Sequence, residues 1–356
     1  MARKGVVRGL FGHKRYEGSA ADICAKIVED CWNGSYFQGS AGHFSQFWAR
    51  DLGMCSDSLV KLGHIDRVRT SLSWALDVYE RNGRITTTIF YGRKAIDIYD
   101  FGSDSVPFLI HALRVSGSGD LVKKHIGFLT KEITRYREMI FDDSLGLVKP
   151  GRYFPGAKDC MKGSSTVYAN TMAAFLSAEI EKIGEVRNVF KNHDFISRMK
   201  GAFWRGDHFK DDLSEEDILS ADANVWPYWT GVFTDTEMMK KSVDSMIREG
   251  LDKPFPIKYT KKRYAEREEF FPWLLTPNYQ GNVAWTQVGA AYIDVVRRIN
   301  PEKAEKYIRQ YTALIEKERN YLELFNEDET PYVGRMGFYH ADEGMIWASL
   351  YLGLVS

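Results

Sequence analysis

The chain has 356 residues, of which 44% are hydrophobic and 14% aromatic. A chain of this length and composition is globular and can bury a large core. Its 48 basic residues are balanced by 48 acidic ones. This balance gives no support for nucleic acid, an anionic membrane surface or a polyanionic substrate as the main partner.

The sequence favours a soluble, cytoplasmic protein. No run approaches the about 20 apolar residues of a membrane helix, and no apolar stretch of signal-peptide length follows the basic N-terminus. The four cysteines contain no CxxC pair. A chain of this length does not need disulfides to fold, so we expect free, packed thiols in a reducing compartment.

Taken in chain order, an arm over residues 1–18 precedes a long series of helical patterns. Apolar residues recur at the helical period in twelve segments, and short turns within most pairs of segments predict antiparallel neighbours. Glycines stand where several of these helices should end. The expected helices span 19–33, 51–63, 65–81, 103–117, 119–140, 164–183, 185–200, 222–233, 235–250, 282–299, 301–325 and 342–354. Residues 84–99 have the pattern of a β-hairpin.

Six motifs rich in glycine, aromatic and carboxylate residues precede every second helix. Each motif contains one residue suited to a helix N-cap: Asp51, Asp104, Ser164, Asp222, Asn282 and Asp342. Successive residues of this set lie 53, 60, 58, 60 and 60 positions apart. A repeat of this length fits a unit of two helices with long loops. Six such units predict one domain over residues 19–356.

The helices that follow the motifs differ in composition from the others. They are poor in charge and rich in small and apolar residues, as in TMAAFLSAEI at 171–180. The intervening helices carry charged stripes and should face water on one side. We therefore predict an all-α fold, an (α/α)6 barrel with an inner and an outer ring, short β-hairpins, and all six motifs at one end.

Two carboxylates at that end are candidates for acid–base chemistry. Asp159 stands on a loop five residues before Ser164, and Glu343 follows the expected cap Asp342, so both side chains are predicted to be available. They come from opposite sides of the ring, and glycoside hydrolysis needs two such groups. The alternative is that Glu343 only interacts with the helix dipole and Asp159 is solvated.

Other residues of the motifs suit a sugar. Arg50 beside Asp51 offers donors and an acceptor, which a hydroxyl group needs, and the alternative is an ion pair at a helix end. Aromatic side chains can cover a sugar face, although some tryptophans on inner helices are expected in the core. The candidate binding residues are Trp48, Arg50, Asp51, Asp104, Asp222, Trp226, Tyr279, Asn282, Trp285 and His340.

These motifs resemble the inverting (α/α)6 glycosidases, which include glucoamylases, trehalases, processing α-glucosidases and amylo-α-1,6-glucosidase. WARD at 48–51 is similar to their W-x-R-D motif, and the stretches 279–293, 342–354 and 158–176 resemble their segments before the tenth helix, before the twelfth, and between the fifth and sixth. The resemblance implies that Asp159 is the general acid, Glu343 the general base, and Arg50 with Asp51 a clamp for sugar hydroxyls.

The chain also departs from that pattern. Lys158 and Cys160 flank Asp159 where those families commonly have tryptophan or a second acidic residue, which puts the assignment of Asp159 in doubt. Asp104 and Asp222 are the next candidates for the acid. There is no room for an additional β-sandwich domain, so subsites for long polymers are not expected.

The resemblance implies an inverting, exo-acting glycosidase for a short α-glucoside or related glycoside, with no cofactor. Two alternatives stay open. One is a sugar epimerase or isomerase that uses His340, with His43 and His111 as further candidates, and the other is a carbohydrate-binding barrel without activity. The sequence contains no HExxH motif or Cys/His spacing of a metal site, so no metal is expected.

Overall fold

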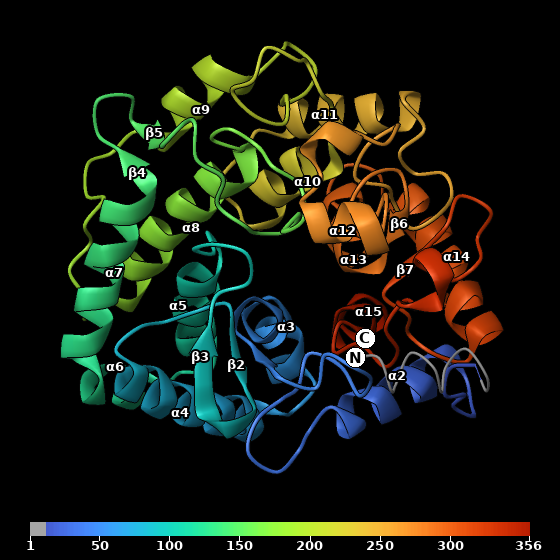
Figure 1. The fold of residues 1–356 in the computed structure, drawn as a ribbon, viewed down its shortest axis with the longest axis horizontal. Coiled ribbons are helices and arrows are strands. Elements are labelled where there is room, and N and C mark those ends of the chain that lie inside the picture. Colours follow the sequence, from blue (N-terminus) through green and yellow to red (C-terminus); the bar gives the residue numbers. More distant parts are fainter. Residues whose placement is uncertain (1–11) are drawn as a thin grey trace.

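In the computed structural model, which describes residues 12–356, the chain is mostly helical and forms a ring of helices (Figure 1). Six helices contact one another in a closed cycle, because each touches the next and the last touches the first. These inner helices are α3 (Ala49–Lys61), α5 (Ser105–Val115), α8 (Val167–Ile183), α10 (Ala221–Trp229), α13 (Thr286–Arg297) and α15 (Ala348–Val355).

A second set of helices lies outside this cycle, and most of them contact the inner helix beside them in sequence. Their charged residues face water and their apolar residues face inward, as in α11 and α14. The outer helices are α2 (Ala20–Asp30), α4 (Ile65–Asn82), α6 (Gly119–Lys124), α7 (Ile126–Ile140), α9 (Phe195–Phe203), α11 (Thr236–Arg248) and α14 (Pro301–Glu318).

Small residues let the inner helices approach closely. The nine residues from Ser105 to Leu113 on α5 are all buried. On α3, a Cβ added to Gly53 would lie 2.4 Å from the Cβ of Phe108 on α5. Glycine at this position therefore sets the distance between two inner helices. This explains why the inner helices are rich in small residues.

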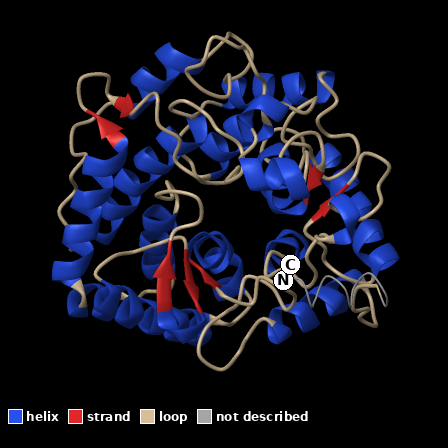
Figure 2. Cartoon of the chain, viewed as in Figure 1, coloured by secondary structure: helices blue, strands red, loops and turns tan. Residues whose placement is uncertain are grey.

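The strands are short and form three small antiparallel sheets (Figure 2). The predicted hairpin is confirmed, since β2 (Thr88–Phe90) pairs with β3 (Lys94–Ile96), and β1 (Phe47–Trp48) joins them. The remaining pairs are β4 (Phe141–Asp142) with β5 (Leu147–Val148) and β6 (Ala284–Trp285) with β7 (Leu324–Phe325). Three 3₁₀ turns are η1 (Tyr91–Arg93), η2 (Ala265–Arg267) and η3 (Arg335–Gly337).

The structure corrects several predicted boundaries. The segment 119–140 is two helices that meet at His125, and the helix α12 (Phe270–Leu275) was not predicted. Predicted helix 301–325 ends at Glu318, because Arg319 adopts a left-handed conformation. The described part of the predicted arm is not separate from the ring, since Tyr16 N donates to Arg319 O over 2.8 Å. Residues 1–11 of the arm lie outside the described residues.

The predicted N-caps are also mostly wrong. Only Asp104 occupies a cap position, and its side chain makes no capping hydrogen bond. Asp51 and Asp222 lie within the first turns of α3 and α10, because extended residues before them start the helices. The periodic spacing therefore located the loops correctly, while the side chains of these aspartates interact with other groups.

Candidate active site

A pocket lies where the loops before the inner helices meet. Its residues come from five separate segments: the start of α3, the loop before α8, the segment through β6, the residue before β7, and the loop before α15. Its lining is Phe44, Trp48, Arg50, Asp51, Ala157, Asp159, Tyr279, Gln280, Trp285, Glu323, Met345 and Trp347. The free volume is ≈40 Å³, enough for water but not for a sugar ring. A sugar ring therefore needs more room than the lining side chains leave in this structure.

Arg50 stands among three carboxylates at the base of this pocket. Its guanidinium nitrogens lie 3.6 Å from Asp104, 3.7 Å from Asp51 and 4.0 Å from Asp159. Nη1 also donates to Gly156 O over 2.6 Å, which ties α3 to the loop before α8. Its Nε finds no hydrogen-bond partner within residues 12–356. A ligand hydroxyl in the pocket can satisfy this donor.

Two of these carboxylates are held in place by other side chains. Asp51 accepts a 2.7 Å hydrogen bond from Trp347 Nε1, and Asp104 accepts one of 2.9 Å from Tyr168 Oη. Burial raises the pKa of Asp104 to about 6 and also raises the pKa of Asp51, while the charge of Arg50 opposes both shifts. Asp104 is buried behind Arg50 and does not line the pocket.

Asp159 does line the pocket, and its loop is fixed from two sides. Gln280 Nε2 donates to Asp159 Oδ1 over 2.9 Å, while Gln280 Oε1 accepts from the backbone N–H of Cys160 over 2.6 Å. On the other side, Lys158 Nζ lies 2.5 Å from Asp211 and 3.1 Å from Asp222. The buried lysine beside Asp159 therefore anchors the loop to the first turn of α10.

A third carboxylate lines the pocket, Glu323, which was not among the predicted residues. It lies between the end of α14 and β7 and is 1% exposed. Tyr279 and Tyr339 donate their hydroxyl protons to its two oxygens, and Asp342 N donates to Oε2 over 3.0 Å. Burial raises the pKa of Glu323 to about 7, with the charge of His43 and the Asp342 N–H acting in the opposite direction.

A buried ion pair supports Glu323 from behind. Asp342 Oδ1 lies 3.0 Å from His43 Nδ1, and its carboxylate also accepts from Ser40 and from the backbone N–H groups of His43 and Phe44. Burial alone would raise the pKa of Asp342, but the charge and hydrogen bond of His43 hold it well below its usual range. This carboxylate joins the loop before α3 to the loop before α15.

Five aromatic side chains line the pocket: Phe44, Trp48, Tyr279, Trp285 and Trp347. The rings of Tyr279 and Trp285 meet edge to face at 5.0 Å, and Trp285 Nε1 donates to Tyr279 O over 2.7 Å. Trp48 Nε1 is buried and finds no acceptor within residues 12–356. Rigid aromatic walls with a free N–H beside charged groups are suited to a sugar.

The structure thus brings together six of the predicted residues and places six elsewhere. Glu343 is outside the pocket, and its Oε2 accepts from Lys14 N over 2.6 Å. Its predicted position in the cleft is therefore wrong, because the last helix begins only at Ala348 and Glu343 lies in the preceding loop, where it contacts the N-terminal segment. The predicted residues that line the pocket are Trp48, Arg50, Asp51, Asp159, Tyr279 and Trp285.

The other predicted residues have different surroundings. Asp104 contacts Arg50, and Asp222 pairs with Lys158. Both aspartates therefore contact residues at or next to the pocket without lining it themselves. Trp226 is fully buried in the core of the inner ring. Asn282 and His340 do not line the pocket either. The Nε2 atom of His340 faces the backbone of Gly337, 3.7 Å from a Cβ placed there.

Glu323 was missed because the predicted helix 301–325 placed it in an exposed last turn. Residues 321–325 form a short apolar run around one glutamate, and periodicity does not distinguish such a run in a strand from the end of a helix. The helix ends seven residues early and this segment continues into β7, which directs the Glu323 side chain inward.

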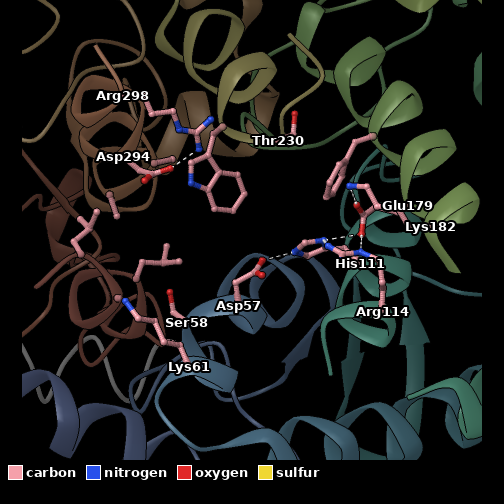
Figure 3. Close-up of a pocket in the computed structure, with 17 residues that line it drawn as sticks. Asp57, Ser58, Lys61, His111, Arg114, Glu179, Lys182, Thr230, Asp294 and Arg298 are labelled. Atoms are coloured by element: carbon pink, nitrogen blue, oxygen red, sulfur yellow. Dashed lines mark hydrogen bonds and ion pairs between the residues drawn. The ribbon is translucent and has the colours of Figure 1, made fainter. Parts of the chain in front are cut away.

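A larger cavity of ≈360 Å³ lies at the opposite end of the ring, among the C-terminal turns of inner helices (Figure 3). Its charged groups largely neutralise each other. His111 bonds to Asp57 at 2.7 Å and Glu179 at 2.9 Å, and Arg298 bonds to Asp294 at 2.6 Å. None of the six motifs contributes to this cavity, so the smaller pocket is the candidate active site.

Residues 12–356 contain no group of three or more His, Cys, Asp or Glu side chains placed to hold a metal ion. No helix in that range has both the length and the apolar character needed to cross a membrane. All four cysteines are buried and free, as predicted.

Several solved structures of glycosidases have a fold similar to that of this chain. A glycosidase variant superposes with a TM-score of 0.70 at 11% identity, over 94% of this chain and 95% of that one. The GH63 mannosylglycerate hydrolase from Thermus thermophilus gives 0.59 at 12% identity, over 94% and 99%. The chain has the fold of these glycosidases. The predicted resemblance is thus confirmed at the level of the fold.

A rhamnosidase from Klebsiella oxytoca with rhamnose bound also matches, with a TM-score of 0.61 at 10% identity. The match covers 95% of this chain but 64% of the rhamnosidase, so about a third of that protein lies outside the matched region. No family model and no curated protein sequence matches the chain. At identities of 10–12%, these likenesses concern the fold alone.

Proposed function

We propose that the chain is an inverting glycosidase built on an (α/α)6 barrel, with Asp159 as general acid and Glu323 as general base. The observation that carries this proposal is that the two carboxylates line one aromatic-walled pocket. Asp159 precedes the third inner helix and Glu323 precedes the sixth. These are the loops in which the resembling families keep their acid and base, and Glu323 replaces Glu343 in the second role.

The environment of Glu323 supports its role as a base. An ionised carboxylate only accepts hydrogen bonds, and Glu323 accepts three, from Tyr279, Tyr339 and Asp342 N. Its pKa of about 7 makes it a stronger base than an exposed glutamate while it remains ionised above neutral pH. These three donors also fix the orientation of the carboxylate.

The reaction follows from these positions. Glu323 takes a proton from a water molecule as the water oxygen forms a bond to the anomeric carbon. The bond between that carbon and the glycosidic oxygen breaks, and Asp159 gives its proton to the departing oxygen. Arg50 and Asp51 bind sugar hydroxyls, and the aromatic walls exclude other water. The reaction uses only water and the two carboxylates, so it requires no cofactor.

The pocket favours a small substrate. Arg50, Asp51 and Trp347 of its lining are buried and lie at or beside the first turns of α3 and α15, so we infer that they close its inner end. A pocket with one closed end accepts the terminal unit of a chain, so we assign exo action on a short α-glucoside or a related glycoside. The position of His340 outside the lining removes the residue on which the epimerase alternative was based.

Variants of the two carboxylates test this proposal. Glu323→Gln and Asp159→Asn should each lower kcat by several orders of magnitude and leave sugar binding measurable, because only proton transfer is lost. Glu343→Gln is the matched control and should retain near-wild-type activity. Nuclear magnetic resonance of the first product of an α-glycoside should show the β-anomer. A protein that binds sugars but turns over no glycoside would instead be a carbohydrate-binding barrel.

A further inference from the structure

An exposed group of large apolar side chains lies beside the candidate active site. Fifteen large hydrophobic side chains are exposed within residues 12–356, and six of them lie on α12 or within and directly after η3. Met336 is 86% exposed, Phe271 68% and Phe270 62%. We call this group the aromatic patch, and its members are Phe270, Phe271, Trp273, Leu274, Met336 and Phe338.

The two segments of the aromatic patch pack against each other. Within α12, the ring of Phe270 stacks on that of Trp273 at 6.2 Å. The Arg335 guanidinium lies 5.9 Å from the Trp273 ring, and Gly334 approaches the carbonyl of Leu275 so closely that a Cβ would lie 2.7 Å from it. The patch is thus one ordered surface. Clustered apolar groups of this kind mark binding surfaces more often than scattered ones do.

One half of the patch is bonded to the loop of the proposed acid. Glu269 N donates to Cys160 O over 2.9 Å, and Lys162 N donates to Arg267 O over 2.7 Å. Phe270 directly follows Glu269, and Cys160 directly follows Asp159. The start of α12 is therefore held against the loop that protonates the leaving group.

The other half is bonded to the surroundings of the proposed base. Gly334 N donates to Tyr339 O over 2.8 Å, and Val333 pairs with His340 across a β-bridge. Tyr339, which directly follows Phe338, donates its hydroxyl proton to Glu323. Both halves of the patch therefore adjoin residues that contact or carry the two carboxylates.

From this continuity we propose that the aromatic patch binds the leaving group of the substrate, and that this leaving group is apolar, an aryl group or a long alkyl chain. The inference rests on the proposed glycosidase activity. A sugar whose glycosidic oxygen meets Asp159 must extend its leaving group past the acid loop, where α12 stands. Among the six side chains only Trp273 has a hydrogen-bonding atom, so the patch suits an apolar group and not a second sugar.

Two substrates with the same sugar test this proposal. Methyl and octyl α-glucopyranoside differ only in the leaving group, and the octyl compound is used below its micelle concentration. We expect kcat/KM to be higher for the octyl compound. The double variant Phe271→Ser/Met336→Ser should reduce the octyl-to-methyl ratio about tenfold and leave turnover of the methyl compound unchanged. Ile196→Ser, an exposed site on α9, is the control and should leave the ratio unchanged.

An unchanged ratio in the double variant would overturn the proposal. A second result would also overturn it. If the wild type is a dimer, and the double variant is a monomer with an unchanged octyl-to-methyl ratio, then the patch binds a second copy of the chain. If neither compound is hydrolysed, the proposed activity fails, and titration calorimetry tests the patch separately. Octyl glucoside should then bind more tightly than glucose to the wild type but not to the double variant. Equal binding to both proteins would reject the patch as an apolar site.

Discussion

The backbone N–H of Asp342 donates a 3.0 Å hydrogen bond to Oε2 of Glu323, while the carboxylate of the same aspartate pairs with His43 at 3.0 Å. Asp342 therefore acts on Glu323 in two opposite ways. Its N–H stabilises the ionised glutamate, and its negative charge, with burial, raises the pKa of Glu323. These opposing effects leave the pKa of Glu323 at about 7, so replacing either kind of neighbour should shift this pKa.

The first prediction concerns the pH dependence of the reaction. Because Glu323 must be ionised to accept a proton, kcat/KM should rise with pH through about 7, the pKa of Glu323 in the free protein. Tyr279→Phe removes a donor to the ionised form, so the rising limb should move to higher pH. A pH–rate profile of both proteins measures this shift. If the rising limb does not move, the group that controls it is not Glu323.

The second prediction reverses this shift. Asp342→Asn removes a negative charge beside Glu323 and keeps the backbone N–H, so the rising limb should move to lower pH. Loss of one partner from a buried ion pair should also lower the free energy of unfolding by about 3–5 kcal/mol. Asp328→Asn, at an exposed turn, is the control for urea denaturation and should change neither quantity. A shift to higher pH would contradict the role given to Asp342.

The third prediction concerns the anchor of the acid loop. Lys158→Met leaves Asp211 and Asp222 buried together without their cation, so we expect a loss of about 3–5 kcal/mol in unfolding free energy at pH 8. Burial raises the pKa of Asp222 to about 6 even with Lys158 present, so its protonation at pH 5 should reduce the loss. Lys162→Met, an exposed lysine of the same loop, should cost less than about 1 kcal/mol. Equal losses at both pH values would argue against the buried carboxylate pair.

The fourth prediction concerns stability in acid. Burial by itself would raise the pKa of Glu179, but hydrogen bonds from His111, Arg114 and Lys182 lower it to about 2. Because its pKa is lower in the folded protein than in the unfolded chain, ionised Glu179 stabilises the fold. This stabilisation is complete above the pKa of the unfolded chain, about 4.5, and is lost as the pH falls toward 2. The contribution is about 3 kcal/mol at about 1.4 kcal/mol per pKa unit. In urea titrations, Glu179→Gln should show a smaller decrease in stability over this range than the wild type.

The fifth prediction tests the packing of the inner ring. Gly53→Ala should lower the free energy of unfolding by about 1–3 kcal/mol, because the new methyl group overlaps Phe108. Gly201→Ala is the matched control, since nothing lies within 4 Å of a Cβ at that helical position. It should stabilise the protein by about 0.5–1 kcal/mol through helix propensity. Thermal denaturation should therefore show a lower melting temperature for Gly53→Ala and a higher one for Gly201→Ala than for the wild type.

Much of the scaffold could be predicted from the sequence because it depends on local periodicity. Helical repeats, short turns and the low charge of alternate helices indicate two rings, and the 53–60-residue spacing of the motifs places their loops together. Arg50, Asp51 and Asp159 could be assigned to one pocket for this reason. Arg50 and Asp51 lie in the first turn of α3, and Asp159 lies in the loop directly before α8, so all three belong to the motif end of the ring.

Glu343 and Glu323 show what only the tertiary structure decided. They are 20 residues apart, and both lie between the last outer helix and the last inner helix, so spacing alone does not distinguish them. Arg319 ends α14 in a left-handed conformation, β7 pairs with β6, and the two tyrosines and Asp342 N then hold Glu323 in the pocket. The sequence alone determined which loops surround the site, because periodic patterns are local. The direction of the Glu323 carboxylate depends on partners 16–44 residues away, which only packing brings together.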